Sequence, residues 1–175
     1  WGIDFVKKLN GMFAIAIYDK FNKKFFLVRD RVGIKPLFLF NYNSTIFFSS
    51  EINSLISVPF FEKKVNLKAI SSYLSYRYPT EDEENFFQGI KRVTPGSYLE
   101  IENDKSFKKN IYWKIPFPNS ANKKNERYYF DKLDELLNKS VKRQLISDVP
   151  LGVFLSGGLD SSLLTAITVK YFGKS

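Results

Sequence analysis

The sequence predicts an α+β fold made of antiparallel sheets, followed by the start of a doubly wound α/β domain. Short segments rich in β-branched and aromatic residues follow one another closely in the first half of the 175-residue chain. After a polar stretch at residues 116–126, the apolar residues recur with the period of a helix. The last part then reads as helix, buried strand, turn and helix, which is the order that opens a doubly wound domain.

The first half predicts four strands joined by tight turns. The strands are expected at residues 11–19, 25–30, 37–43 and 45–50, where β-branched and aromatic side chains dominate. Polar, glycine and proline residues separate them. Such close spacing favours an antiparallel meander or a set of hairpins.

Two helices are predicted next. The first is expected within residues 49–57, with Ser49 or Ser50 as its N-cap, and the second within residues 66–78, with Asn66 as its cap. The second helix is expected to bury one apolar face, formed by Leu67, Ile70, Tyr73 and Leu74.

The chain then turns from the acidic loop at residues 80–87 to further extended structure. A turn at Pro95 and Gly96 precedes a predicted strand, and residues 111–117 form another extended piece. We interpret the polar residues 116–126 as a linker between two domains.

The second half predicts two helices around one strand. Residues 128–147 form a helix, residues 149–155 a short apolar strand of the kind buried in a parallel sheet, and residues 161–173 a helix ending near Gly173. The apolar face expected for the first helix consists of Phe130, Leu133, Leu136, Leu137, Val141 and Leu145.

Composition excludes several kinds of chemistry. With no cysteine and no histidine, the chain has no disulfide, no thiolate metal site, no thiol nucleophile and no imidazole base. No apolar run approaches the roughly 20 residues of a membrane span, and no basic-then-apolar leader opens the chain. A net charge of +9 would suit a polyanionic partner, but the lysines are scattered, so we favour a solvated basic surface.

The segment "SGGLDSS" at residues 156–162 predicts an anion site. Glycines between a strand and a helix let the backbone approach an anion, and the unpaired N–H groups and dipole of the helix attract negative charge. Ser156, Ser161 and Ser162 would add hydroxyl donors, and Asp160 would cap the helix or hold a Mg²⁺ that accompanies phosphates. The alternative is an ordinary strand-to-helix turn with capping side chains. It is not a Walker loop, because G-x-x-x-x-G-K-[ST] is absent.

These residues carry a family resemblance. "SGGLDSS" resembles the pyrophosphate-binding loop of the ATP pyrophosphatase superfamily, and with the preceding "SDVPLGVFL" it resembles the glutamine-hydrolysing asparagine synthetase family. "LNGMFAIAIYD", "VRDRVGIKPLF" and "FFSSEINSLI" resemble the later part of that family's N-terminal glutaminase domain. "IKRVTPGSYLEI" and "YWKI" resemble the segment that joins its two domains.

The resemblance implies a domain plan and a reaction. Residues 1–115 would end an αββα glutaminase sandwich (a class II glutamine amidotransferase domain), residues 116–126 would be a linker, and residues 127–175 would begin the ATP-binding synthetase domain. The family adenylates the aspartate carboxylate with MgATP, and ammonia from glutamine then gives asparagine, AMP and pyrophosphate. The expected partners are ATP, aspartate and glutamine, with a homodimer compatible and neither membrane nor nucleic acid expected. The expected location is the cytoplasm.

Carried over by position, the resemblance implies an ATP and Mg²⁺ site. Its residues are Leu155, Ser156, Gly157, Gly158, Asp160, Ser161 and Ser162. Leu155 would contact the nucleotide, the others would hold the pyrophosphate side, and Asp160 would be the Mg²⁺ ligand. We interpret residues 29–37 ("RDRVGIKPL") as a structural turn that shapes the glutaminase sheet and the domain interface, and Glu51 as a scaffold or interface position.

The chain also departs from the family pattern. The family's N-terminal cysteine nucleophile is absent, so we expect an internal piece of a longer enzyme that is inactive in glutamine hydrolysis and asparagine synthesis on its own, and prone to aggregate. Alternatives are a paralogous amidotransferase acting on another carboxylate, an ATP pyrophosphatase that modifies RNA, and a non-catalytic remnant.

Overall fold

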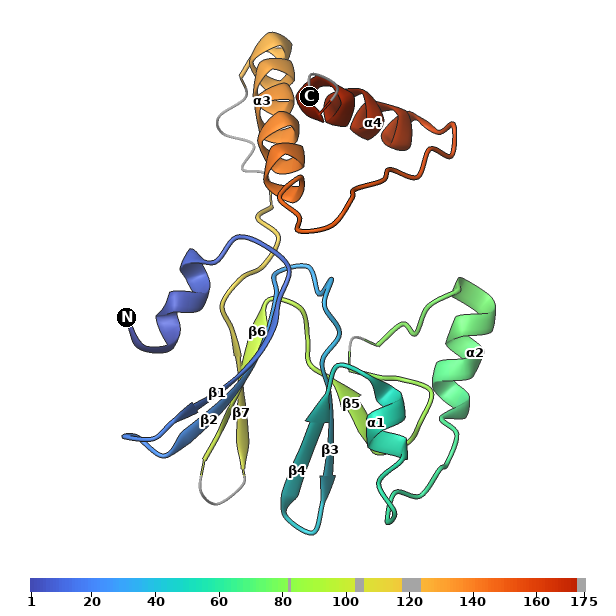
Figure 1. Ribbon diagram of the computed structural model, residues 1–175. Coiled ribbons are helices and arrows are strands. Elements are labelled where there is room, and N and C mark those ends of the chain that lie inside the picture. The colour runs from blue at the N-terminus through green and yellow to red at the C-terminus, as the bar shows by residue number, and fades with distance from the viewer. Residues whose placement is uncertain (82, 103–105, 118–123, 173–175) are drawn as a thin grey trace. The chain divides into compact units, whose positions relative to one another are not determined.

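The structure of the chain is a computed structural model that describes residues 1–81, 83–102, 106–117 and 124–172 (Figure 1). The chain divides into two compact units, Trp1–Pro116 and Phe117–Ser175. Each unit is described by itself.

The first unit contains two antiparallel sheets. The four-stranded sheet has the order β1-β2-β6-β7, formed by β1 (Ala14–Asp19), β2 (Lys24–Arg29), β6 (Ser97–Ile101) and β7 (Phe107–Ile111). The three-stranded sheet has the order β4-β3-β5, formed by β4 (Thr45–Ser49), β3 (Phe38–Tyr42) and β5 (Ile90–Arg92). All neighbouring strands in both sheets are antiparallel.

The predicted hairpins are confirmed, but they do not form one meander. Strands β1 and β2 pair as one hairpin, and β3 and β4 pair as another. The two hairpins belong to different sheets, because the turn at residues 30–37 carries the chain from one sheet to the other. The strand predicted after Pro95 and Gly96 is β6.

Side chains along each strand point alternately to the two faces of its sheet, and this alternation creates a layered core. Leu27 and Leu39, from different sheets, belong to the same buried cluster between the sheets, whereas Phe26 and Phe40 point to the outer faces. The 3₁₀-helix η1 (Gly2–Lys8) and the helix α1 (Ile52–Ile56) cover these outer faces (Figure 1). The result is the αββα arrangement of an α+β fold.

Helix α2 (Leu67–Tyr76) forms where it was predicted, but its expected face is not buried. The Asn66 Oδ1 accepts a hydrogen bond from the Ala69 N–H at 3.3 Å, as expected for an N-cap. Leu67 and Leu74 are 75% and 78% exposed, while Ala69 is fully buried. Periodicity identifies an apolar stripe, but it does not show what covers that stripe.

The cap predicted for α1 is also wrong. Glu51 occupies the N-cap position of this helix, and its side chain makes no capping hydrogen bond. The hydroxyl of Ser49 instead accepts the Glu51 N–H at 3.0 Å. Glu51 is exposed.

The second unit contains two helices, α3 (Glu126–Gln144) and α4 (Leu159–Phe172). Asn125 caps α3 by accepting the Tyr128 N–H at 2.9 Å. Of the face predicted for α3, Val141 is buried and Leu137 is partly buried, whereas three side chains nearer the N-terminus are half exposed or more. These exposed members of the predicted face are Phe130, Leu133 and Leu136.

The strand predicted at residues 149–155 is wrong. Residues 151–156 have no regular structure, and Phe154 is 99% exposed. A strand satisfies its backbone polar groups by pairing with a neighbour, and the described residues of the second unit include no other strand. Gly173, where α4 was expected to end, lies outside the described residues. No helix in the part of the chain that the structure describes is long and apolar enough to cross a membrane.

Candidate anion-binding site

The turn at residues 156–162 leads directly onto the N-terminus of α4. Gly157 has φ +80°, in the left-handed region where glycine is favoured, and this residue reverses the chain after the extended segment. The Gly158 carbonyl accepts the Ser162 N–H at 3.0 Å, which is the first hydrogen bond of the helix. The glycine pair therefore stands immediately before the unpaired N–H groups of the first helical turn.

Two serine hydroxyls hold the shape of this turn. The Ser161 hydroxyl donates to the Gly158 carbonyl at 3.1 Å, and the Ser156 and Ser161 Oγ atoms lie 2.9 Å apart. Since the single hydroxyl hydrogen of Ser161 goes to Gly158, Ser156 supplies the hydrogen between the two serines. The Gly158 N–H approaches the Ser156 Oγ at 3.5 Å. In this conformation both hydroxyl hydrogens are used inside the turn.

All the residues expected at the ATP site come together in this one segment. Leu155, just before the turn, is 61% exposed, and Ser162 is exposed at the start of α4. A Cβ atom added at Gly157 would meet no heavy atom within 4 Å. The turn is therefore open to solvent at Gly157 and stands at the N-terminus of a helix, where unpaired amides and the helix dipole favour anions.

Asp160 lies within the first turn of α4 and is exposed. Its carboxylate is thus close to the positive end of the helix dipole, and no capping hydrogen bond from it is seen in the described residues. Within the described ranges, no group of three or more His, Cys, Asp or Glu side chains could hold a metal by itself. A single carboxylate suits a Mg²⁺ whose other ligands are phosphate oxygens and water.

The turn after β2 confirms the structural interpretation of Arg29 and Asp30. The Arg29 guanidinium donates to the carbonyls of Lys35, Gly33 and Val93 at 2.9, 2.7 and 2.7 Å. The side chain is only 5% exposed. Arg29 therefore joins the turn between β2 and β3 to the backbone that follows β5.

The buried carboxylate of Asp30 receives backbone N–H groups from the same turn. Oδ1 accepts from Val32 and Ile34 at 3.2 and 3.0 Å, and Oδ2 accepts from Phe13 and Lys35 at 3.3 and 2.9 Å. Burial raises the pKa of Asp30, but the N–H donors favour the ionised form more strongly, so the pKa lies below its ordinary value.

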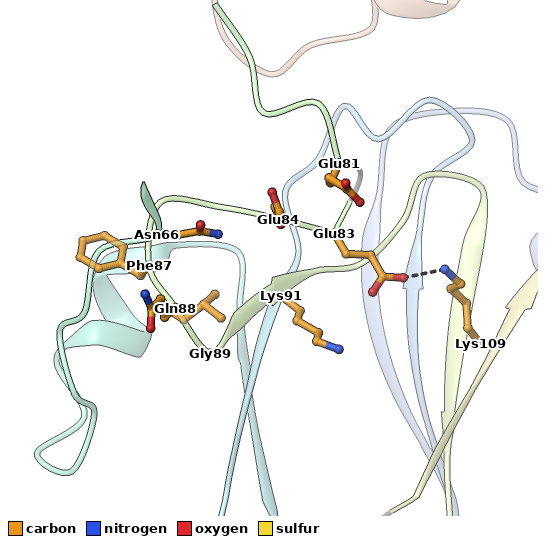
Figure 2. A pocket seen from close by; sticks show the side chains of 10 residues that line it. Asn66, Glu81, Glu83, Glu84, Phe87, Gln88, Gly89, Lys91 and Lys109 are labelled. Atoms are coloured by element: carbon orange, nitrogen blue, oxygen red, sulfur yellow. Dashed lines mark hydrogen bonds and ion pairs between the residues drawn. The ribbon is translucent and has the colours of Figure 1, made fainter. Parts of the chain in front are cut away.

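The acidic loop lines a cavity of about 540 Å³ in the first unit, which sequence analysis did not identify (Figure 2). Glu83 pairs with Lys109 at 2.6 Å, Glu81 pairs with Lys68 at 2.8 Å, and Glu84 lies 3.5 Å from Lys68. The hydrogen bond from Lys109 lowers the pKa of Glu83, against a smaller opposing effect of burial. Since each of these carboxylates already has a lysine partner, we interpret the cavity as a structural feature.

The second unit has a mainly apolar groove of about 420 Å³. Helix α3, residues 151–153 and helix α4 form its walls, with Val141, Leu151 and Leu164 among the lining side chains. The segment before the turn at residues 156–162 therefore shares a groove with both helices.

Comparisons with known proteins place these features in a family. The glutamine amidotransferase domain family matches residues 1–113, and the asparagine synthase family matches residues 132–174. The glutamine-hydrolyzing asparagine synthetase 3 of Bacillus subtilis is 34% identical over 99% of this chain and 28% of its own length. The glutamine-hydrolyzing asparagine synthetase 2 of the same organism is 42% identical over 92% of this chain and 23% of its own length.

A third relative carries a different name. The amidase chry2 of Gibberella zeae is 30% identical over 93% of this chain and 24% of its own length. The chain thus spans about a quarter of the length of these relatives. With its two sheets and covering helices matched over residues 1–113, followed by a segment of asparagine synthase type, the chain belongs to the glutamine amidotransferase domain family in the form found in glutamine-hydrolysing asparagine synthetases.

Proposed function

We propose that this chain is part of an ATP-dependent ligase that amidates aspartate with ammonia from glutamine. The observation that carries the proposal is the turn at residues 156–162, which presents helix amides to open space within the segment of asparagine synthase type. The names of the Bacillus subtilis relatives support the same reaction.

In the proposed reaction the turn holds the pyrophosphate side of ATP. The amides at the start of α4 and the hydroxyl of Ser162 donate to phosphate oxygens, while Ser156 and Ser161 keep the turn in shape. Leu155 contacts the nucleotide. Asp160 would hold a Mg²⁺ ion, which would supply positive charge to stabilise the leaving pyrophosphate.

The chemistry follows from the reactivity of a carboxylate. A carboxylate oxygen of aspartate bonds to the α-phosphorus of ATP, and the bond to pyrophosphate breaks. Ammonia then attacks the carbonyl carbon of the mixed anhydride, AMP leaves, and a proton is released as asparagine forms. Activation is needed because a free carboxylate is a poor electrophile, whereas AMP is a good leaving group.

We also propose the domain plan of residues 1–115, 116–126 and 127–175. The division of the chain into Trp1–Pro116 and Phe117–Ser175 supports it, as do the separate family matches. Because the chain contains no cysteine, it has no thiol to attack glutamine, and we expect no glutamine hydrolysis from these residues alone. The cytoplasm and a homodimer remain part of the proposal.

A second candidate is an amidotransferase that acts on a carboxylate other than aspartate. The similarity to a relative named amidase supports it, because relatives with different names share this region. Both candidates use the same anion-binding turn, so binding at the turn is tested first.

The test measures binding of pyrophosphate and of ATP, each with Mg²⁺, to the chain by titration calorimetry. We expect Gly157→Ala to weaken both at least about tenfold, because alanine disfavours the left-handed backbone by about 1–2 kcal/mol and the turn would rearrange. Gly11→Ala is the control, since Gly11 lies outside the second unit, has no left-handed φ and has equally open space. Absence of millimolar binding, or equal binding by the Gly157 variant, would contradict the proposal.

A further inference from the structure

Helix α3 carries a buried polar side chain that the proposed reaction does not use. Asn138 is 9% exposed and lies beside Val141, which is 8% exposed on the same helix, while the side of α4 is buried at Ile167. Burying an amide in such a contact is unfavourable unless its polar atoms find partners. The position of Asn138 therefore needs an explanation.

The amide of Asn138 connects the two helices. Its Nδ2 donates to the carbonyl of Asp134 at 2.8 Å and to the Asp134 Oδ1 at 2.9 Å, within α3. Its Oδ1 accepts the Tyr171 hydroxyl at 3.2 Å and the Lys170 Nζ at 3.3 Å, both from α4. Asp134 thus orients the amide so that its oxygen faces α4.

Apolar packing alone would define the position of α4 poorly. Apolar side chains lie on all sides of this helix, so several rotations would offer α3 a similar surface. Hydrogen bonds require particular atoms to meet, and a buried asparagine can select one register in this way. A slip by one residue would move α4 by about 1.5 Å and turn it by about 100°.

The register matters because the proposed ATP site has two parts. The helix amides and Ser162 move with α4, whereas Leu155 belongs to the segment whose residues 151–153 line one wall of the groove that α3 and α4 also line. A ligand that touches both parts requires the correct placement of α4 on α3. A ligand that touches the turn alone does not.

We propose that Asn138 is a positioning residue that fixes the register of α4 and so aligns the nucleotide part of the site with the pyrophosphate part. This inference rests on the proposed function. It concerns how ATP is distinguished from pyrophosphate, and it assigns Asn138 no contact with either ligand.

The binding test compares Asn138→Leu and Tyr171→Phe with the unaltered chain, using ATP and pyrophosphate, each with Mg²⁺. We expect ATP affinity to fall at least about tenfold, because the two contact regions are misaligned, and pyrophosphate affinity to stay within about twofold. The melting temperature of Asn138→Leu should not fall, since leucine suits the apolar contact. Arg143→Leu, at an exposed polar side chain that lies on the same helix and does not line the groove, is the control and should leave both affinities unchanged.

Equal losses for the two ligands, or no loss for ATP, would overturn the inference. So would equal affinity of the unaltered chain for ATP and pyrophosphate, because residues before the turn would then add no binding. Tyr171→Phe removes a single oxygen atom, so it keeps the test decisive if Asn138→Leu does not fold.

A measurement without ligand separates this inference from the proposed function. Since the chain has no cysteine, spin labels attach only at the introduced sites of Lys132→Cys and Ala166→Cys, which are exposed on α3 and α4. We expect one narrow distance distribution in the unaltered background and a broader or displaced one with Asn138→Leu. An unchanged distribution would show that Asn138 does not set the register, whatever the chain binds.

Discussion

Replacing Asp30 with asparagine should strongly destabilise the first unit. The Asp30 side chain has no exposed surface, and its two oxygens accept four backbone N–H groups between them. Asparagine keeps the shape but supplies one oxygen and one NH₂ group. The NH₂ group would face two N–H donors, so two acceptor interactions are lost and two donors are left unsatisfied.

The expected loss is large relative to the stability of a domain. A hydrogen bond to a charged group contributes about 1.5–3 kcal/mol, so losing two such bonds lowers the free energy of unfolding by about 3–6 kcal/mol. Typical domains have about 5–15 kcal/mol in total. The Asp30→Asn variant should therefore unfold at a much lower urea concentration.

Urea unfolding followed by tryptophan fluorescence measures this loss. Both tryptophans, Trp1 and Trp113, lie in the first unit, so the signal reports on that unit. Asp19→Asn is the matched control, because the Asp19 carboxylate also accepts backbone N–H groups, at 3.0 and 3.1 Å, but in an exposed turn. A loss at Asp30 below about 1 kcal/mol, or no larger than at Asp19, would show that the buried carboxylate does not stabilise the turn in this way.

The effect should also depend on pH in a defined direction. The pKa of folded Asp30 lies below the ordinary value of 3.8, so its stabilisation is fully present above that value. As the pH falls below 3.8 and through the lower folded pKa, protonation removes the stabilisation. The difference in free energy of unfolding between the unaltered chain and the Asp30→Asn variant should thus be constant near neutral pH and shrink in acid. A difference that grows in acid would contradict this assignment.

Two further predictions concern a turn and a helix surface. Gly96→Ala should lower the free energy of unfolding in urea by about 2–5 kcal/mol, because Gly96 has φ +63° and its new Cβ would lie 2.5 Å from the Trp113 carbonyl oxygen. Gly11→Ala, in open space, should lower it far less. Equal losses at the two glycines would contradict the steric argument. Hydrogen bonds from Lys139 and Lys132 lower the pKa of Glu135 to about 2. An NMR titration should show this pKa rising toward about 4.3 in about 1 M salt. A pKa that does not respond to salt would exclude the ion pairs as the cause of the shift.

Features encoded by neighbouring residues could be predicted from the sequence. The hairpins β1–β2 and β3–β4 follow from alternation and turn residues, and the Asn66 cap follows from the start of an apolar stripe. The sequence also predicted that Arg29 and Asp30 belong to a structural turn. What the sequence does not contain is the identity of their partners, such as Val93, which lies 64 residues from Arg29.

Features that depend on distant partners could not be predicted. The acidic loop is paired with Lys68 and Lys109, which are 13 and 26 residues away from their glutamate partners. The apolar stripe of α2 predicted a buried face, but Leu67 and Leu74 remain exposed. Residues 149–155 have the composition of a buried strand and lack a neighbouring strand among the described residues. In each case the pattern states a preference, and tertiary structure decides whether the preference is satisfied.

The turn at residues 156–162 has a shape that neighbouring residues encode, and a relation to α3 that depends on distant partners. The hydrogen bonds of the Ser156 and Ser161 hydroxyls and of the Ser162 N–H join residues 156–162 to one another, so the turn keeps its shape even though the segment before it makes no strand. In the proposed function, recognition of a phosphate group would therefore need only local structure, whereas recognition of a nucleotide would need Leu155 and α4 to be held in a fixed relation. The local part was predictable from seven consecutive residues. The placement of α4 on α3 depends on Asn138, Lys170 and Tyr171, whose contact across two helices cannot be predicted from a local sequence pattern.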